Sequence, residues 1–495
     1  MINAILGLDV GTTTTKAVLF DLAGRELARS NSEPYSNLTP HTGWVEQDPE
    51  RLWRAVVSTI RHVVEQAGVG VHVQAVGMAA QSGSLLPADG DGKPVYPLIT
   101  WMDGRTKNLV KQWLIEGAEE QVRALSGWSL YPGLCLPTIA WLRENDHETF
   151  TAAHHYFSVN DFIAYRLSGH FVMNPSNGGG MQLVDIHTGT WSDALLQLAG
   201  ISSAQLSPIR PSGTVIGEIS REVCHETKLP EGTVLVNGGH DQVCTALALG
   251  VNDPGKLLLA CGTAWVITGV ADTKDLERVP PSLDLNFHAQ DGRYTISQSL
   301  GGLGASLEWW VHQAWRGSGD SPSREALFVA MDTEVTAAQA DSSIYFLPLT
   351  GGHDNPATTQ YGSFQGLQLN QNRADLARAI MESAAFELRW ALEPIKEAGL
   401  PLVELWMVGG AAKSATWPSI LANITAIPIR LPQYDNWPAL GGAILAGVGM
   451  GELSSIEDGL SRFRKPAAEV VPDRALNERY DDRYHTYKTL RSERT

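Results

Sequence analysis

The feature that most restricts the fold is a strand–turn–strand pattern that occurs twice, about 250 residues apart. The first copy spans residues 5–20 and reads ILGLDVGTTTTKAVLF, and the second spans residues 257–267 and reads LLLACGTAWVI. In each copy, apolar runs flank a Gly–Thr turn with little side-chain bulk, which is typical of a β-hairpin. Two such hairpins at this separation indicate an internal duplication.

The length of 495 residues also favours two domains, because one hydrophobic core rarely grows to that size. The segment 251–255 (VNDPG) lies between the hairpins and is rich in turn-forming residues, so we place the domain boundary there. We expect an N-terminal domain over residues 1–250 and a C-terminal domain over residues 256–450. A charged tail over residues 451–495 should follow, with a surface helix after Asp473.

Strands and helices alternate along the chain, which predicts the α/β class. One example is the apolar run at residues 234–236, which precedes a helix-like segment at residues 242–249. A long helix is predicted over residues 373–398, where apolar side chains recur at the spacing of one helical face. Asn372 together with Asp375 is suited to cap the start of that helix.

The formal net charge of −17 excludes some classes of partner. General binders of nucleic acids or anionic membranes need a basic face, so neither partner is expected. No stretch reaches the roughly 18 uninterrupted apolar residues of a membrane span, and the N-terminus carries no signal-peptide pattern. We expect a cytoplasmic protein with reduced, buried thiols, because no CxxC pair occurs among Cys135, Cys224, Cys244 and Cys261.

The first hairpin carries residues suited to a phosphate site. Gly11 lets the backbone approach an anion, and Lys16 supplies positive charge. Thr12 and Thr13 offer hydroxyl and N–H donors. Asp9, at the end of the strand, is suited to hold Mg²⁺ through water, because that ion keeps part of its hydration shell. An ordinary threonine-rich hairpin explains the same residues, and this segment alone leaves the two interpretations equal.

Asp241 follows a buried strand in the segment 238–242 (GGHDQ), and active sites of α/β proteins collect at strand ends. Its carboxylate is suited to accept the proton of a hydroxyl group during phosphoryl transfer. Taken alone, the segment favours a simpler role for Asp241 as the N-cap of the following helix. His240 is interpreted as a packed or hydrogen-bonded histidine, because no partner at ligand spacing would complete a metal site.

Two further segments are weaker signals. Residues 409–414 (GGAAKS) follow a strand-like run, and a glycine pair there would let a nucleotide lie against the backbone, although many unrelated turns look the same. Trp101 offers a flat face for a sugar ring. Asp103 and Arg105 follow it closely and supply polar groups.

Taken together, these segments resemble the FGGY family of carbohydrate kinases, in order from about residue 3 to about residue 450. The sharpest match is the family's C-terminal signature, which residues 362–382 satisfy at every constrained position. Residues 44–53 resemble the family's W-x-E-Q-x-P segment, and residues 101–105 its W-x-D-x-R strand end. The signature is long and specific in its spacing, so chance is a poor explanation.

The resemblance implies two α/β domains with the duplicated, ribonuclease H-like fold of actin, hexokinases and chaperone ATPases, facing each other across a deep cleft. It implies ATP and Mg²⁺ as cofactors, Asp241 as the general base and Asp9 as the metal contact through water. It is compatible with a homodimer. The implied ATP contacts are Thr12, Thr13, Lys16, Gly262, Thr263, Gly409, Gly410, Ala411 and Lys413.

The sugar-binding positions depart from the family pattern. Residues 80–84 read AQSGS where xylulokinases resemble GQMHG, and Thr138 stands where the N-terminal signature expects lysine. Asp354 replaces an arginine that xylulokinases and gluconokinases share, and Asn174 replaces the aspartate of a T-D-x-S segment. The resemblance implies that the sugar is bound by Gln81, Ser82, Trp101, Asp103, Asn174 and Asp241.

We therefore expect ATP-dependent phosphorylation of a neutral ketose or polyol, with D-xylulose as the leading substrate. Gluconate, glycerol or another polyol are the alternative substrates. A different class is a nucleotide-dependent binding or assembly protein, as in the actin and chaperone branches, but those branches lack the C-terminal signature. A regulatory pseudokinase is disfavoured by Asp9, Asp241 and Thr263, and an assay with and without sugars would separate a plain ATPase.

Overall fold

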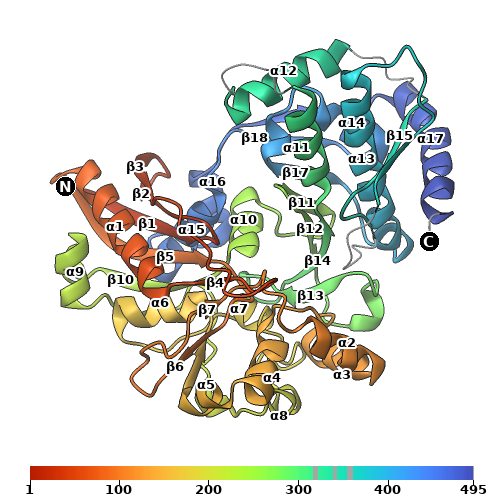
Figure 1. Cartoon of the computed structure of the whole chain (residues 1–495). Coiled ribbons are helices and arrows are strands. Elements are labelled where there is room, and N and C mark those ends of the chain that lie inside the picture. Colours follow the sequence, from red (N-terminus) through yellow and green to blue (C-terminus); the bar gives the residue numbers. More distant parts are fainter. Residues whose placement is uncertain (316–321, 338–342, 354–360, 494–495) are drawn as a thin grey trace.

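The computed structural model describes residues 1–315, 322–337, 343–353 and 361–493, and its core is two large mixed β-sheets. Figure 1 shows that one sheet belongs to the N-terminal half of the chain and the other to the C-terminal half. The first sheet has six strands, in the order β3 (Glu26–Asn31), β2 (Thr15–Asp21), β1 (Ile2–Val10), β5 (Val71–Ala80), β10 (Val234–His240) and β9 (Val215–Glu218). The second has seven, in the order β13 (Asp284–Phe287), β14 (Tyr294–Gly301), β12 (Trp265–Ala271), β11 (Lys256–Cys261), β17 (Glu404–Gly409), β18 (Ile429–Pro432) and β19 (Ala467–Val470).

The two sheets share one topology. Strand β1 pairs antiparallel with β2 and parallel with β5, and β11 pairs in the same way with β12 and β17. The next strand, β10 or β18, is parallel to its inner neighbour, and an antiparallel strand, β9 or β19, closes each series. The α/β class and the internal duplication predicted from the hairpins are therefore confirmed.

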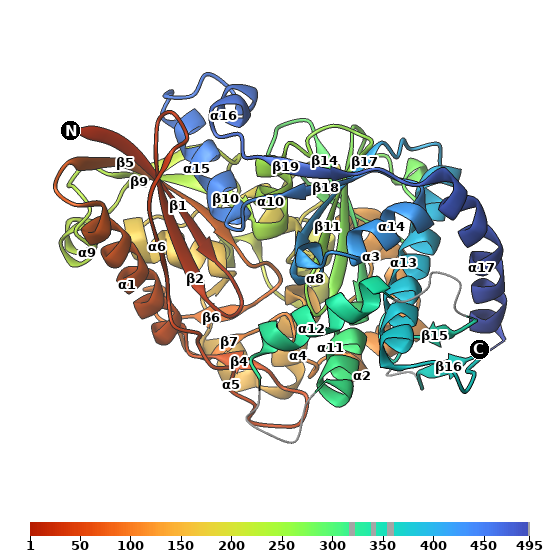
Figure 2. The ribbon, with the colours of Figure 1, turned by 90° about the horizontal axis from the view of Figure 1, so that it is seen from above.

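Two helices lie between the sheets and join them (Figure 2): α10 (Asp241–Leu249) and α15 (Trp437–Gly449). Although α15 belongs to the C-terminal half of the chain, it packs directly on β1 and β5 of the N-terminal sheet. Glycines allow this approach: a Cβ on Gly7 would lie 1.9 Å from the Ala439 carbonyl oxygen, and one on Gly77 would lie 2.0 Å from that of Gly442. A Cβ on Gly441 of α15 would lie 2.1 Å from the Cys244 oxygen of α10.

The opposite face of the N-terminal sheet is covered by α1 (Pro49–Ala67) and α6 (Val159–Ser168). Successive side chains of a strand point to opposite faces of its sheet. Leu6 accordingly packs in the cluster with α1 and α6, while its neighbour Ile5 packs in the cluster with α10 and α15. Both faces of the sheet are buried, which explains why the strand reads as a continuous apolar run.

The long helix predicted in the C-terminal half is confirmed as α13 (Arg373–Glu397), and Asn372 forms a capping box with Asp375. The tail holds α16 (Ile456–Arg462), strand β19 and α17 (Arg474–Ser492). The expectation of a surface helix after Asp473 is only partly right. The inner face of α17 is buried, and the Tyr487 hydroxyl donates to Glu387 of α13 at 2.5 Å.

The other described elements surround these two sheets. None of the described helices is long and apolar enough to cross a membrane. All four cysteines are buried and unpaired, as predicted. The remaining helices and strands are β4 (Glu46–Gln47), β6 (Leu86–Ala88), β7 (Leu98–Ile99), α2 (Lys107–Ile115), α3 (Ala118–Ser126), α4 (Cys135–Asn145), α5 (His147–Ala152), β8 (His155–Phe157), α7 (Pro175–Gly179), α8 (Asp193–Ala199), α9 (Arg221–Thr227), α11 (Leu303–Ala314), α12 (Arg324–Ala337), β15 (Tyr345–Leu347), β16 (Ser363–Gln365) and α14 (Trp417–Thr425).

Candidate active site

The turn of the first hairpin, residues 11–14, is held in place by side chains from neighbouring segments. The Gly11 carbonyl oxygen accepts hydrogen bonds from the Tyr35 hydroxyl and from Gln81 Nε2, the latter at 3.3 Å. The Thr12 carbonyl oxygen accepts from Gln47 Nε2 at 2.7 Å. Carbonyl groups of the turn are thus already bonded to the protein, and this fixes the conformation of the turn.

Asp9 lies at the end of β1 and is almost fully buried, with 4% of its surface exposed. Burial raises the pKa of its carboxyl group to about 7. Lys16 Nζ, 3.5 Å away, acts in the opposite direction, and the charge of Asp241 adds to the rise. A buried carboxylate whose charge is only partly balanced is suited to a cation. Among the described residues no group of three acidic, histidine or cysteine side chains is arranged to hold a metal ion.

Asp241 is the first residue of α10, directly after β10, and His240 occupies the N-cap position. The N-cap interpretation of Asp241 is therefore wrong. Its Oδ1 accepts a hydrogen bond from the Gln242 N–H at 2.6 Å and lies 3.0 Å from His240 Nε2. Its Oδ2 has no partner among the residues that the structure describes, and the side chain is 27% exposed. One carboxylate oxygen is held by the protein, and the other is available to a ligand.

Ser176 supports the loop that carries His240 and Asp241, a role that was not predicted from the sequence. The His240 N–H donates to Ser176 Oγ at 2.9 Å, and Ser176 Oγ donates to Asn174 Oδ1 at 2.8 Å. Asn174 caps α7 and is fully buried. Its side chain therefore holds Ser176 in place and does not face an open site. Ser176 matches the serine of the family's T-D-x-S segment, and this match is the sequence feature that could have indicated its role.

Of the residues expected to bind sugar, Gln81 and Trp101 lie against the first hairpin. Thr12 Oγ1 donates to Gln81 Oε1 at 3.2 Å and accepts from Trp101 Nε1 at 3.0 Å. Trp101 is 44% exposed, so much of its ring remains open to a ligand. Ser82 is half-buried, and its hydroxyl donates to the Asn177 carbonyl oxygen at 3.4 Å.

Asp103 is placed differently, because it is 2% exposed and forms a buried ion pair with Arg105. Asp103 Oδ1 lies 2.8 Å from Arg105 Nε, and Asp103 Oδ2 accepts from the Val45 N–H at 2.6 Å. The same guanidinium contacts Glu46 at 2.6 Å and stacks over the Trp44 ring at 3.9 Å. The sequence pattern located both residues at a strand end but did not indicate that they neutralise each other.

Two glycine-containing turns lie at the carboxyl ends of β11 and β17 in the C-terminal sheet. Gly262 and Thr263 are exposed in the turn between β11 and β12, and Gly409 pairs with Cys261 at the adjacent end of β17. Gly409 has φ +98°, and a Cβ there would lie 2.5 Å from the Cys261 oxygen, so only glycine fits. The loop continues as a short 3₁₀ turn, Gly410–Lys413. Open backbone beside these glycines fits a nucleotide that approaches closely.

The candidate site residues therefore lie at the carboxyl ends of parallel strands in two sheets of one topology, with Asp241 on the first sheet and glycine-containing turns on both. This arrangement defines the class of protein: two-domain ATP-using enzymes with the duplicated fold shared by actin, hexokinases and chaperone ATPases.

Comparisons with known proteins identify the family. The model of the FGGY carbohydrate kinase N-terminal domain matches residues 4–248, and that of the C-terminal domain matches residues 257–450. The chain belongs to the FGGY family of carbohydrate kinases, and it is an ATP-dependent carbohydrate kinase.

The chain is 28% identical to a probable L-xylulose kinase of Pasteurella multocida (strain Pm70), covering 99% of this chain and 98% of the relative. It is also 28% identical to an L-xylulose/3-keto-L-gulonate kinase of Escherichia coli (strain K12), covering 98% and 96%. Among solved structures, xylulose kinase from Rhodospirillum rubrum superposes with a TM-score of 0.90 at 26% identity, covering 99% of this chain and 98% of that one.

Proposed function

We propose that the chain transfers the terminal phosphoryl group of ATP to a hydroxyl group of a ketopentose, with D-xylulose as the leading substrate and Asp241 as general base. The proposal rests on the carboxylate of Asp241, because only one of its oxygens is bonded to the protein. Oδ1 is bonded within its own loop, while Oδ2 has no partner in the described part of the chain. Relatives named for xylulose and L-xylulose agree with a ketopentose.

In the proposed reaction, the sugar hydroxyl oxygen bonds to the terminal phosphorus of ATP as the bond from that phosphorus to the bridging oxygen breaks. Asp241 Oδ2 takes the hydroxyl proton, and ADP leaves. The hydrogen bond from Gln242 N–H to Oδ1 fixes the direction of the carboxylate. In this proposal, Lys16 and N–H groups of the two hairpin turns stabilise the negative charge on the transferred group.

Mg²⁺ would supply charge neutralisation of the phosphates when bound, and Asp9 is the residue suited to hold it through water. The nucleotide would lie between the two glycine turns, with Thr12 and Thr13 on one side and Gly262, Thr263 and the loop 409–413 on the other. These contacts remain proposals from the resemblance and from the positions of the turns.

The preference for a neutral sugar rests on the cations near the site. Arg105 is the one cation in the W-x-D-x-R segment. It forms ion pairs with Asp103 and Glu46, so it is not available to a substrate carboxylate. Gln81, Ser82 and Trp101 bring no charge. Asp354, which the sequence analysis used to argue against acidic substrates, lies outside the described residues. A relative named for 3-keto-L-gulonate makes an acidic sugar the main alternative.

The test is ADP release with a panel of pentuloses, pentitols, hexuloses, gluconate, 3-keto-L-gulonate and glycerol. A ketopentose should give the highest kcat/KM, and the Asp241→Asn variant should lose about 10²–10⁴ in kcat while it still binds ATP. Asp193→Asn is the matched control, because Asp193 is also the first residue of a helix but lies exposed and away from the site. Near-normal turnover by Asp241→Asn would remove the general-base assignment, and a clear preference for gluconate would overturn the substrate.

A further inference from the structure

A cavity of about 810 Å³ lies between the two halves of the chain, at the end of α10 opposite to the active site. Asp241 begins α10 on the catalytic side, and Leu249 and Gly250 line the cavity at its other end. Eight residues of helix place the two ends about 12 Å apart. Lys256, where β11 begins, lines the cavity, while the turn after β11 belongs to the active site. The cavity is therefore a separate site on the reverse side of the same elements.

Basic residues outnumber acidic ones around this cavity, although the whole chain has a net charge of −17. The acidic members are Glu404 and Glu457. The basic members are Lys256, Arg430, Arg464 and Lys465. A local positive excess on an acidic protein attracts small anions to that place and not to the rest of the surface.

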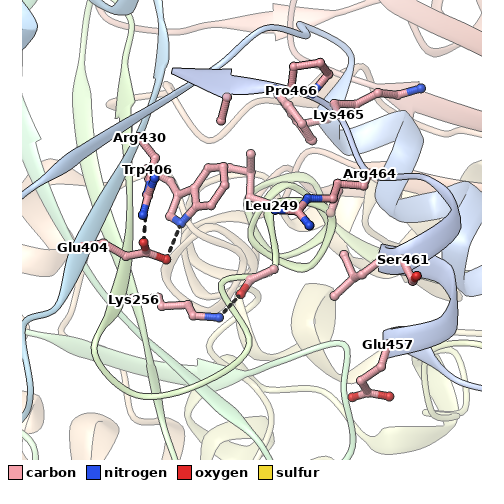
Figure 3. A pocket seen from close by; sticks show the side chains of 15 residues that line it. Leu249, Lys256, Glu404, Trp406, Arg430, Glu457, Ser461, Arg464, Lys465 and Pro466 are labelled. Atoms are coloured by element: carbon pink, nitrogen blue, oxygen red, sulfur yellow. Dashed lines mark hydrogen bonds and ion pairs between the residues drawn. The ribbon is translucent and has the colours of Figure 1, made fainter. Parts of the chain in front are cut away.

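The basic side chains differ in how many hydrogen bonds and ion pairs they already make within the protein. Arg430 pairs with both Glu404 and Glu469, each at 3.1 Å. Lys465 Nζ donates to the Gly24 carbonyl oxygen at 3.1 Å and points away from the cavity (Figure 3). Lys256 Nζ donates to the Gly250 carbonyl oxygen at 3.1 Å and lies 4.0 Å from Asp253 Oδ2, and an ammonium group has three N–H donors in all. Arg464 has no hydrogen-bond or ion-pair partner among the described residues, and Figure 3 shows its guanidinium directed into the cavity.

Trp406 supplies a flat apolar wall in the middle of the same cavity (Figure 3). Its indole N–H donates to Glu404 Oε1 at 3.0 Å, which fixes the plane of the ring. A fixed aromatic face binds the C–H face of a sugar ring or the face of a nucleobase, and a guanidinium binds phosphate through two parallel N–H donors. An unpaired arginine in the same cavity as a fixed tryptophan is therefore suited to bind a ring that carries a phosphate group.

We propose that this cavity is a second ligand site, which binds a small phosphate monoester with its phosphate on Arg464 and Lys256 and its ring on Trp406. The site is built from both halves of the chain, since α10 lies on one side and the first residues of β11 and β17 on the other. A bound ligand would contact both halves next to the connection over residues 250–256.

Isothermal titration calorimetry with the full chain tests the proposal, using inorganic phosphate, ribose 5-phosphate and AMP as probes. Each titration is done with the active site filled by a non-hydrolysable ATP analogue and Mg²⁺, so the outcome does not depend on which sugar the enzyme phosphorylates. We expect ribose 5-phosphate, AMP or both to bind at one site per chain, more tightly than inorganic phosphate. Arg464→Gln should weaken that binding about tenfold or more, because it removes a charge-assisted hydrogen-bond pair.

Arg474→Gln is the matched control, since the Arg474 side chain is 93% exposed and, within the described part of the chain, pairs with Glu478 of α17 alone. Trp406→Leu should weaken binding of the two ring-bearing probes and leave that of inorganic phosphate unchanged, which separates the ring contact from the phosphate contact. The proposal is overturned if no probe binds at millimolar concentration, or if Arg464→Gln and Arg474→Gln bind alike. Binding that survives Arg464→Gln but is lost in Asp241→Asn would belong to the active site and would also overturn it.

Discussion

At the residue scale, single buried side chains carry both the chemistry and the support of the site. Asp9 and Asp103 are both nearly fully buried, but their surroundings differ. Asp103 is neutralised by Arg105 at 2.8 Å, whereas Asp9 has only the partly exposed Lys16 at 3.5 Å. A buried carboxylate with incomplete compensation is suited to bind a cation, and one with full compensation is suited to hold structure. Sequence spacing alone could not make this distinction, because both aspartates simply lie at or just after a strand end.

The first prediction follows from the raised pKa of Asp9, about 7. Below that pH the carboxyl group is protonated and cannot hold a cation, so affinity for Mg²⁺–nucleotide should fall, by up to about tenfold for each pH unit below the pKa. Binding is measured by calorimetry between about pH 6 and about pH 8 for the wild type and for Asp9→Asn. The nucleotide phosphates titrate in both measurements, but only the wild type has a titrating carboxyl group at residue 9. Equal pH dependence in both proteins would contradict the prediction.

The same pKa has a consequence for stability in the absence of ligands. Because the folded-state pKa of Asp9 is raised, the folded state binds a proton more readily than the unfolded state. Stability is therefore lost as pH rises from the unfolded value toward about 7, since the buried charge must form. The ligand-free Asp9→Asn variant should melt at a higher temperature than the wild type at pH values above about 7 and at a similar temperature near about pH 4.

A further prediction concerns Asp103, which the sequence analysis placed among the sugar contacts. Its two oxygens accept from Arg105 and from the Val45 N–H, so Asp103→Asn would leave the Arg105 charge buried and less compensated. We expect a loss of about 3–5 kcal/mol in the free energy of unfolding, measured by denaturant titration. Asp193→Asn again serves as control. Unchanged stability combined with a higher sugar KM would show that Asp103 binds the substrate directly.

At the element scale, the sequence predicted the features that depend on interactions between residues close together in the chain. The two hairpins and α13 with its Asn372–Asp375 cap appear where the sequence pattern places them, since turn residues and helical spacing act over a few residues. The packing of α15 on the N-terminal sheet was not predicted. That contact joins residues about 365 to 430 apart in sequence, and only the pairs of glycines hint at close backbone approach.

The close packing of α15 gives a test at this scale. A Cβ on Gly77 would lie 2.0 Å from the Gly442 oxygen, and the atom in the way is backbone, which cannot move aside independently. Gly77→Ala should therefore lower the free energy of unfolding by about 1–3 kcal/mol or more. Gly70→Ala is the control, because Gly70 lies just before the same strand with open space around it. If the two variants unfold at the same denaturant concentration, the direct contact between α15 and the sheet is wrong.

At the scale of the whole molecule, duplication places two equivalent sheet edges opposite each other, and α10 and α15 connect them (Figure 2). In the proposed site, the first sheet contributes Asp241 and the second contributes the glycine turns, so neither half would hold a complete site. The family resemblance predicted site residues in both halves, whereas the roles of Ser176 and Asn174 depend on contacts between distant segments. A site divided between two halves operates only when the halves are correctly spaced.

The last prediction is that the two halves close on ligand binding. Water must be excluded during phosphoryl transfer, because it would otherwise accept the phosphoryl group in place of the sugar. The connection over residues 250–256 contains Gly250 and Gly255, both with positive φ, and is the candidate hinge. Small-angle X-ray scattering should show a radius of gyration near about 23 Å for the free enzyme. That radius should fall by a few per cent with the preferred sugar and a non-hydrolysable ATP analogue, while a sugar that is not phosphorylated serves as control. Identical profiles with and without both ligands would mean that the site is already closed in the free enzyme.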